Sequence, residues 1–121
     1  MSRSATSILV FGVYLCVLGI FLLLTPNTLL AVLGLPLTTE VWIRILGGLV
    51  AIAGGYYIQA ARHELVPFFR ATIWGRLTVL ALLIVFVVLG LTPPMIVVFG
   101  IIDAIGAFWT AAALRDPTRT A

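Results

Sequence analysis

The sequence contains no lysine, one cysteine and one histidine, and four acidic residues against seven arginines. Only 9% of its 121 residues are charged, whereas 63% are hydrophobic, and the mean hydropathy is +1.27. A soluble domain of this size needs a charged surface, which so few charged groups cannot supply. The composition therefore excludes an ordinary soluble protein and indicates an integral membrane protein.

The scarcity of cysteine and histidine also excludes several kinds of site. Cys16 has no second cysteine with which to form a disulfide within the chain. Because Cys16 and His63 lie in distant segments, we do not expect a zinc or haem site built from them. The sequence also lacks a recognisable Ser-His-Asp combination and a phosphate-binding loop. We therefore predict no catalytic residue, no metal ligand and no cofactor, and we predict that the protein is not an enzyme.

Four apolar runs have the length of membrane-spanning helices. They cover about 5–24, 41–61, 71–91 and 95–114, and each is near the roughly 20 residues that cross a hydrocarbon core. Since a backbone in lipid must satisfy its own hydrogen bonds, helices are expected rather than open strands. Thr25-Pro26 predicts a short interfacial helix at about 26–33. The predicted fold is all-α: one transmembrane domain over residues 1–121, built as a four-helix bundle.

The arginines outside these runs lie on one side of the predicted membrane. The N-terminus, the middle connector and the C-terminal tail carry Arg3, Arg62, Arg70, Arg115 and Arg119. The connectors 25–40 and 92–94 carry none. The positive-inside rule therefore predicts that both termini are cytoplasmic. Arginines scattered at segment ends also argue against nucleic acid as a partner.

A pattern in the second span returns in the fourth. GGLVAIAGGYY (47–57) aligns with FGIIDAIGAFW (99–109), so that Gly54 falls on Gly106. The match fits a duplicated helical hairpin, but Gly, Ala and aromatic residues are also common in membrane helices. Both interpretations stay open. Asp103 aligns with Ala51, so the acid is not part of the shared pattern.

Small residues recur at four-residue spacing in the same two spans. Gly47, Ala51 and Gly55 form one such set, and Gly100 and Ala104 form another. Small side chains allow close approach of helix backbones, which stabilises packing in lipid. We predict helix packing at these positions, either within the chain or between copies of it.

Four charged residues lie within or beside the predicted spans, and they are the candidate site residues: Asp103, Arg76, Arg44 and Glu40. Asp103 is expected near the membrane midplane, with Arg76 about 8 Å and Arg44 about 5 Å from opposite surfaces. Arg44 can pair with Glu40 at i, i+4 or extend outward to the interface. For Asp103 two hypotheses stand: an interhelical clamp with Arg76, or binding of a proton, an ion or a substrate amine.

Aromatic residues gather toward the predicted cytoplasmic side: Tyr56, Tyr57, Phe68, Phe69, Trp74, Phe108 and Trp109. Tyrosine and tryptophan at such positions usually anchor a helix at the membrane interface. The alternative is a cavity on that side that holds a quinone, a lipid or a pigment ring.

The segments TPNTLLAVLGLPLTTEVWIRILGG, AIAGGYYIQAAR, PFFRATIWGR and FGIIDAIGAFWTAAALR resemble small bacterial four-span membrane proteins of the BphX-like and DoxX-like kind. The resemblance concerns the layout of nearly the whole chain and includes no diagnostic motif. It implies a place in the bacterial cytoplasmic (inner) membrane. DoxX-type proteins are associated with a quinone-reducing thiosulfate oxidation complex, so the resemblance also implies an accessory subunit. It assigns no catalytic residue to this chain.

These observations favour a small non-catalytic membrane protein that acts as an accessory or scaffold subunit or as a homo-oligomer. Its expected partners are the lipid bilayer and other membrane subunits or a second copy of itself. One alternative is a small proton-linked transporter that uses Asp103. The other is a binding protein for a lipid, a quinone or a pigment.

Overall fold

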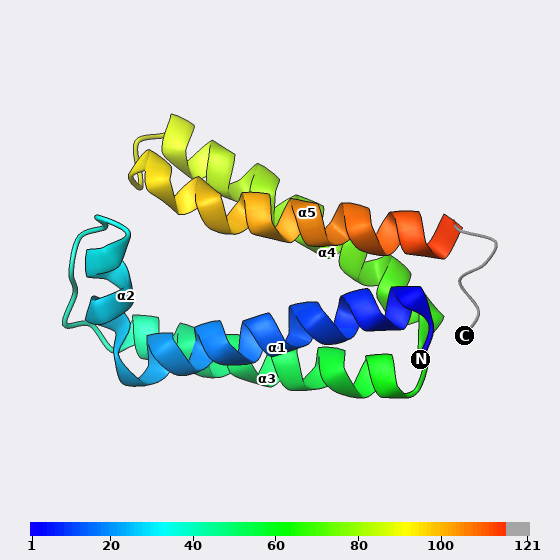
Figure 1. The fold of residues 1–121 in the computed structure, drawn as a ribbon. Helices are drawn as coiled ribbons and strands as arrows, with labels where there is room; N and C mark the ends of the chain where they lie inside the picture. Colours follow the sequence, from blue (N-terminus) through cyan, green and yellow to red (C-terminus); the bar gives the residue numbers. More distant parts are fainter. Residues whose placement is uncertain (116–121) are drawn as a thin grey trace.

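The computed structural model describes residues 1–115, and over this range the chain is helical with no strand (Figure 1). The elements are α1 (Arg3–Leu24), α2 (Pro26–Val32), α3 (Trp42–Arg62), α4 (Val66–Val88), η1 (Pro94–Ile96) and α5 (Val97–Arg115). The all-α prediction is therefore confirmed, and α2 occupies the position of the predicted short helix. Arg119, which entered the prediction of orientation, lies outside the described residues.

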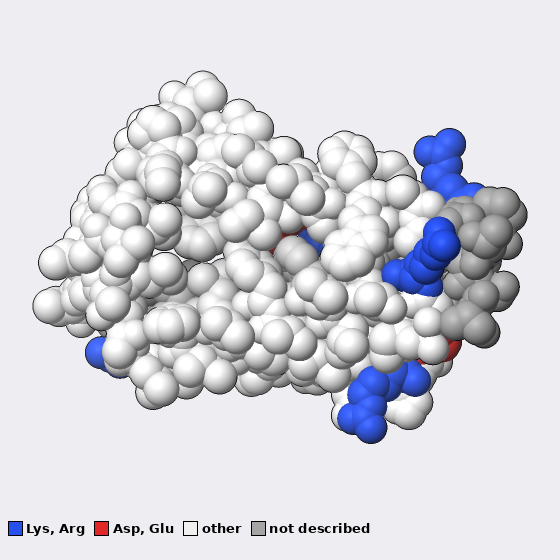
Figure 2. Space-filling model, viewed as in Figure 1, with Lys and Arg blue, Asp and Glu red and all other residues white. Residues whose placement is uncertain are grey.

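Four helices are long and apolar enough to cross a membrane: Arg3–Leu24, Trp42–Arg62, Val66–Val88 and Pro94–Arg115. Many large apolar side chains lie on the outside of the molecule, for example Leu49 and Ile105. On the face seen in Figure 2, basic atoms gather at the ends of the molecule and leave the middle almost uncharged. These features support a multi-pass membrane protein, because apolar side chains that face outward along a span are stable in lipid.

The third long helix differs from its predicted bounds. It begins at Val66 rather than at 71, because Pro67 lies in the first turn, where a missing backbone N–H costs nothing. It ends at Val88 rather than at 91 because Gly90 takes a φ of +75°, and the Leu91 N–H bonds back to the Phe86 carbonyl at 2.9 Å. Arg76 consequently lies about 15 Å from the start of α4, deeper than expected and near the middle of the helix.

The helices form two antiparallel hairpins, one of α1 with α3 and one of α4 with α5 (Figure 1). The hairpins meet mainly where α1 packs against α5. They approach each other at the end that carries the N-terminus and lie farther apart toward α2. At the close end a buried core joins them, formed by Ala5, Ile8, Ala60, Ala61 and Phe69.

Glycines bring the backbones of α1 and α3 into contact. A Cβ atom added to Gly19 would lie 2.4 Å from the Ala51 nitrogen and 2.5 Å from the Gly47 oxygen. Two turns earlier in α1, a Cβ on Gly12 would lie 2.9 Å from the Gly54 oxygen. Neither position can hold a larger residue without backbone movement, so this seam fixes the geometry of the first hairpin.

Gly55 does not belong to this seam, although its spacing grouped it with Gly47. No heavy atom lies within 4 Å of the position that its Cβ would occupy. Since helical residues are separated by about 100° of rotation, a residue eight positions after Gly47 is turned away by about 80°. Gly54, seven positions on, returns to the same face. The contact follows the helical period and not strict four-residue steps.

In the second hairpin, Gly100 packs directly against α4. A Cβ on Gly100 would lie 2.8 Å from the Leu80 Cα atom. Ala104, one turn later, is also buried, with 7% of its surface exposed. Gly100 therefore packs within the chain.

Candidate functional site

A cavity of about 460 Å³ lies between the two hairpins. It begins beside Tyr57 and Arg76, near the middle of the molecule, and extends toward α2 and the start of α5. Its wall is almost entirely apolar and is formed by Phe11, Tyr14, Leu15, Leu18, Leu22, Leu29, Leu30, Leu35, Ile43, Leu46, Val50, Ala53, Tyr57, Gly75, Arg76, Val79, Leu83, Ile96, Phe99 and Asp103. Cavities of this size and character accommodate small organic molecules.

Two charged residues, Arg76 and Asp103, stand among the described residues that line this cavity. Tyr14 lines it as well, and each of the three lies near the middle of its span. Acidic and basic atoms are visible together in a hollow midway along the otherwise uncharged middle of the molecule (Figure 2). The cavity thus has a polar end at mid-depth and an apolar remainder.

The guanidinium of Arg76 is held by neighbouring hydroxyl and carbonyl groups. Only 2% of the residue is exposed. Its Nε donates to the Thr72 carbonyl at 3.2 Å, and its Nη2 donates to the hydroxyls of Thr72 at 3.0 Å and Thr110 at 2.9 Å. These bonds tie α4 to α5 and fix the orientation of the guanidinium.

The hydroxyl groups beyond Thr110 continue as a directed chain into α1. The Ser7 hydroxyl donates to the Ser4 carbonyl at 2.6 Å and lies 2.7 Å from the Thr110 hydroxyl. A hydroxyl has one proton to donate, so Ser7 must accept from Thr110, which in turn accepts from Arg76. In this series of hydrogen bonds from Arg76 Nη2 to the Ser4 carbonyl, every donor therefore has an acceptor.

Two aromatic rings flank the same guanidinium. The Arg76 Cζ atom lies 4.8 Å from the centre of the Phe11 ring and 5.9 Å from that of Tyr57. Cation–π contacts of this kind stabilise a guanidinium that has left water. Gly106 leaves the necessary room, because a Cβ at that position would lie 3.1 Å from Arg76 Nη1.

Three polar groups at this end of the cavity form no hydrogen bond to another of residues 1–115, although the charges of Asp103 and Arg76 interact across the cavity. Arg76 Nη1 and the Tyr14 hydroxyl are both buried without a hydrogen bond. Asp103 forms neither an ion pair with Arg76 nor a hydrogen bond to any other described residue. The hypothesis of an Arg76–Asp103 clamp is therefore not met by a direct contact: Nη2 bonds to the threonine hydroxyls, and Nη1 forms no hydrogen bond.

Arg44 and Glu40 lie outside the cavity. Arg44 Nη1 donates to the carbonyls of Leu23 at 2.7 Å and Leu24 at 3.2 Å, at the C-terminus of α1. It forms no ion pair with Glu40, which lies in the connector before α3, so helical i, i+4 spacing does not apply. Arg44 thus stabilises the C-terminus of α1 by donating to carbonyls that have no partner within the helix.

The aromatic residues predicted as a group divide by location. Tyr57 lines the cavity, whereas Tyr56, Trp74 and Phe108 are exposed on the outside, as interface anchors would be. The cavity extends from mid-depth away from the arginine-rich end, whereas the alternative drawn from the aromatic residues placed a cavity at that end.

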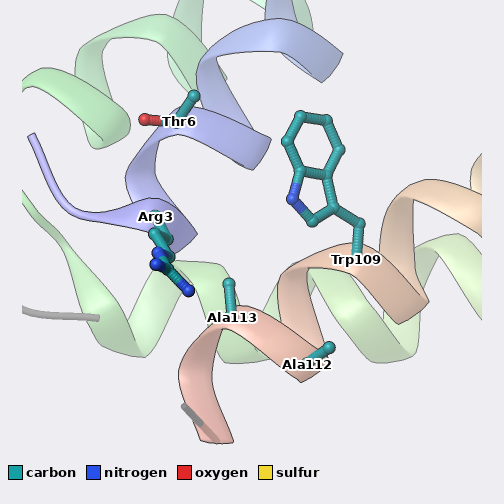
Figure 3. A pocket seen from close by; sticks show the side chains of 5 residues that line it. All are labelled: Arg3, Thr6, Trp109, Ala112 and Ala113. Atoms are coloured by element: carbon teal, nitrogen blue, oxygen red, sulfur yellow. The ribbon is translucent and has the colours of Figure 1, made fainter. Parts of the chain in front are cut away.

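A smaller cavity of about 320 Å³ lies at the arginine-rich end (Figure 3). It is lined by Arg3, Thr6, Trp109, Ala112 and Ala113, with residues from α1 facing residues from α5. Its polar residues, Arg3 and Thr6, are exposed, so it offers no buried polar group to orient a ligand. The larger cavity is the stronger candidate.

The sequence did not single out Tyr14, Thr72 or Ser7 as site residues. Each is an ordinary polar residue within an apolar helix, and its role depends on which helix it faces. Ser7 and Thr110 are separated by 103 positions and meet only because α1 packs against α5. The signal that could have identified them is that hydroxyl groups within membrane spans tend to form hydrogen bonds between helices.

No group of three potential metal ligands is found among the described residues. Comparison of the chain with protein-family models, with curated proteins and with solved structures finds no match in any of the three.

Proposed function

We propose that this protein is a non-catalytic membrane protein that binds an apolar small molecule with a compact polar head. The observation that carries the proposal is an apolar cavity of about 460 Å³ that ends at the Asp103 carboxylate and at two buried groups without a hydrogen bond, the Tyr14 hydroxyl and Arg76 Nη1. Buried polar groups without partners are costly, and a bound polar head removes that cost.

The depth of the polar end in the membrane limits which classes of ligand can fit the cavity. Phospholipid head groups lie at the membrane surface, whereas this polar end lies near the middle of the spans. A molecule with a small head and a long apolar body fits this arrangement better than a phospholipid. An ordinary lipid acyl chain would leave Arg76 and Tyr14 unpartnered.

The proposed location is the bacterial cytoplasmic membrane with both termini inside. Arg3, Arg62, Arg70 and Arg115 lie at the same end of the molecule, which supports that orientation through the positive-inside rule. The resemblance to DoxX-like and BphX-like proteins supports the same location. A protein of this kind would serve as an accessory subunit that stores or presents the molecule to a membrane partner.

The test begins with purification of the full chain in a mild detergent. Organic extraction followed by mass spectrometry, together with an absorbance spectrum, should reveal a molecule retained in about one copy per chain. Gly75→Leu should expel it, since Gly75 lines the cavity and no heavy atom lies within 4 Å of its Cβ position.

Gly48→Leu is the matched control. Its Cβ position is equally open, but Gly48 does not line the cavity. The control should retain the molecule. Equal retention by both variants, or a wild-type protein that carries only bulk lipid, would refute the proposal.

A proton-linked transporter is the second candidate, favoured by one observation. The Asp103 carboxylate lines a cavity within a span and forms no hydrogen bond or direct ion pair with another of residues 1–115. Intramembrane acids of this kind often carry protons. In proteoliposomes, Asp103→Asn should abolish proton-coupled uptake and leave the assembled protein intact. If a proton gradient drives no uptake by the wild type, this candidate fails.

A further inference from the structure

We infer that the head group of the cavity ligand is uncharged and carries a hydroxyl, so that the ligand belongs to the class of long-chain alcohols. This inference rests on the proposed function and concerns which head group the cavity selects. It depends on the charges, the donors and the acceptors that the polar end presents.

Charge is the first consideration. The Arg76 guanidinium stays protonated in proteins. In a medium of low polarity it needs a counter-charge, and Asp103 is the acid among the described residues lining the same cavity. A carboxylate or phosphate head would be repelled by Asp103, and an ammonium head would be repelled by Arg76. A neutral head avoids both penalties.

Hydrogen bonding is the second consideration. Arg76 Nη1 can only donate, the Tyr14 hydroxyl can donate or accept, and the Asp103 carboxylate accepts. A ketone or an ester can satisfy the donors but offers no proton to Asp103. A hydroxyl accepts from Arg76 or Tyr14 and also donates to Asp103. It is therefore the simplest neutral group that partners both kinds of site.

Among residues 1–115, no other charged residue lines this cavity to change the balance of charge. From α1 and α3 the rings of Phe11 and Tyr57 face the guanidinium, and the Thr72 and Thr110 hydroxyls are already occupied by Nη2 and their own acceptors. Arg44 and Glu40 do not line the cavity.

The apolar part of the cavity determines the length and the apolar character of the ligand's tail. On α3 the lining runs from Tyr57 to Ile43, fourteen residues, which corresponds to about 21 Å along the helix. Apart from Tyr14, Arg76 and Asp103 at its polar end, the wall over that distance is apolar. A single unbranched or isoprenoid chain, with its head beside Arg76 and its tail toward α2, fits this shape.

The experiment compares three probes that share one chain and differ only in the head: tetradecanol, tetradecanoate and tetradecylamine. The full-length protein is delipidated in detergent at neutral pH, and competition with a fluorescent fatty alcohol gives the three dissociation constants. Tetradecanol should bind at least about tenfold more tightly than either charged probe, which is a difference of about 1.4 kcal/mol. Equal affinities would overturn the inference while leaving the cavity proposal in place.

Two variants and a control sharpen the result. Asp103→Asn removes the negative charge, so affinity for tetradecanoate should rise about tenfold and that for tetradecanol should fall. Tyr14→Phe should weaken tetradecanol binding severalfold. Glu40→Gln, a change of the same charge outside the cavity, should alter none of the three.

The outcomes separate the two proposals. If Asp103→Asn leaves affinity for tetradecanoate unchanged, the charge argument is wrong. If that variant fails to fold, the ranking of the three probes on the wild type still decides the question. If no probe binds and no molecule copurifies, the proposed function fails together with the inference. If a charged molecule copurifies and Gly75→Leu expels it, only the inference fails.

Discussion

The hydroxyls of Ser7 and Thr110 lie 2.7 Å apart, and their hydrogen bond joins α1 of the first hairpin to α5 of the second. Thr110 also receives a hydrogen bond from Arg76, so the contact between hairpins and the orientation of the guanidinium depend on one hydroxyl. The polar end of the cavity is thus built by the same bonds that hold the two halves of the molecule together.

Thr110→Val should therefore weaken the fold and disturb the site together. The substitution keeps the side-chain shape but leaves Ser7 without a donor and removes one acceptor from Arg76. Hydrogen bonds between membrane helices average about 0.6 kcal/mol, and an unpartnered buried group costs about 1–3 kcal/mol, so we expect a loss of about 1–2 kcal/mol. Reversible unfolding in mixed detergent micelles measures it.

Thr78→Val provides the control for that measurement. The Thr78 hydroxyl donates at 2.8 Å to the Trp74 carbonyl of its own helix and is exposed, so it joins no two helices. It should leave the unfolding free energy nearly unchanged. An equal loss of unfolding free energy in the two variants would show that the hydrogen bond between the hairpins adds no stability beyond that of a bond within one helix.

Gly19→Ala should destabilise the first hairpin. The new methyl group would meet backbone atoms of Ala51 and Gly47 at 2.4 and 2.5 Å, and backbone cannot rotate away as a side chain can. Overpacking of this kind typically costs about 1–3 kcal/mol. Gly48→Ala introduces the same methyl group where no heavy atom lies within 4 Å, and it should stay within about 0.5 kcal/mol of the wild type.

Glu64 should make the stability of the fold depend on pH. Its carboxylate accepts hydrogen bonds from the Ser2 backbone N–H at 2.8 Å and from the Ser2 hydroxyl at 2.6 Å. These bonds favour the ionised form and hold the pKa of Glu64 below its ordinary value. The stabilisation is therefore complete above the ordinary pKa and is lost as the pH falls through the lower pKa of the folded state.

The measurement is the melting temperature of the wild type and of Glu64→Gln from neutral pH down to about pH 3. The gap between them should be largest near neutral pH and should shrink on acidification. Other acidic groups contribute to both proteins and cancel in the difference. A gap that does not change with pH would contradict the proposed role of the carboxylate.

Arg44→Gln should loosen the C-terminus of α1. The side chain donates to the Leu23 and Leu24 carbonyls and places a positive charge at the negative end of the helix dipole. Such contacts are worth about 0.3–1 kcal/mol. The measurement is hydrogen–deuterium exchange at residues 21–24, which Arg44→Gln should increase. Arg70→Gln is the control, because it removes the same charge from an exposed position of α4, and it should have little effect on that exchange.

The sequence alone determined the class of the fold. Long apolar runs with few charges permit only helices in a membrane, because every backbone group there needs an internal partner. The approximate bounds of the helices also followed from the sequence. The bounds of α4 were wrong at both ends, because Pro67 fits a first helical turn and Gly90 ends the helix after Val88. Asp103 and Arg76 were recognisable as candidates because charge within a span is rare.

Only the tertiary structure decided what those residues do. The sequence left open whether Asp103 pairs with Arg76 or binds another group. In the structure Arg76 Nη2 bonds to the hydroxyls of Thr72 and Thr110, and both charged residues line one cavity. Hydrophobic patterning could not reveal this, since a helix that faces lipid on one side and protein on the other is apolar all round. Which face meets which neighbour is set by close contacts such as that of Gly19 with Ala51, and these contacts place the cavity between the hairpins.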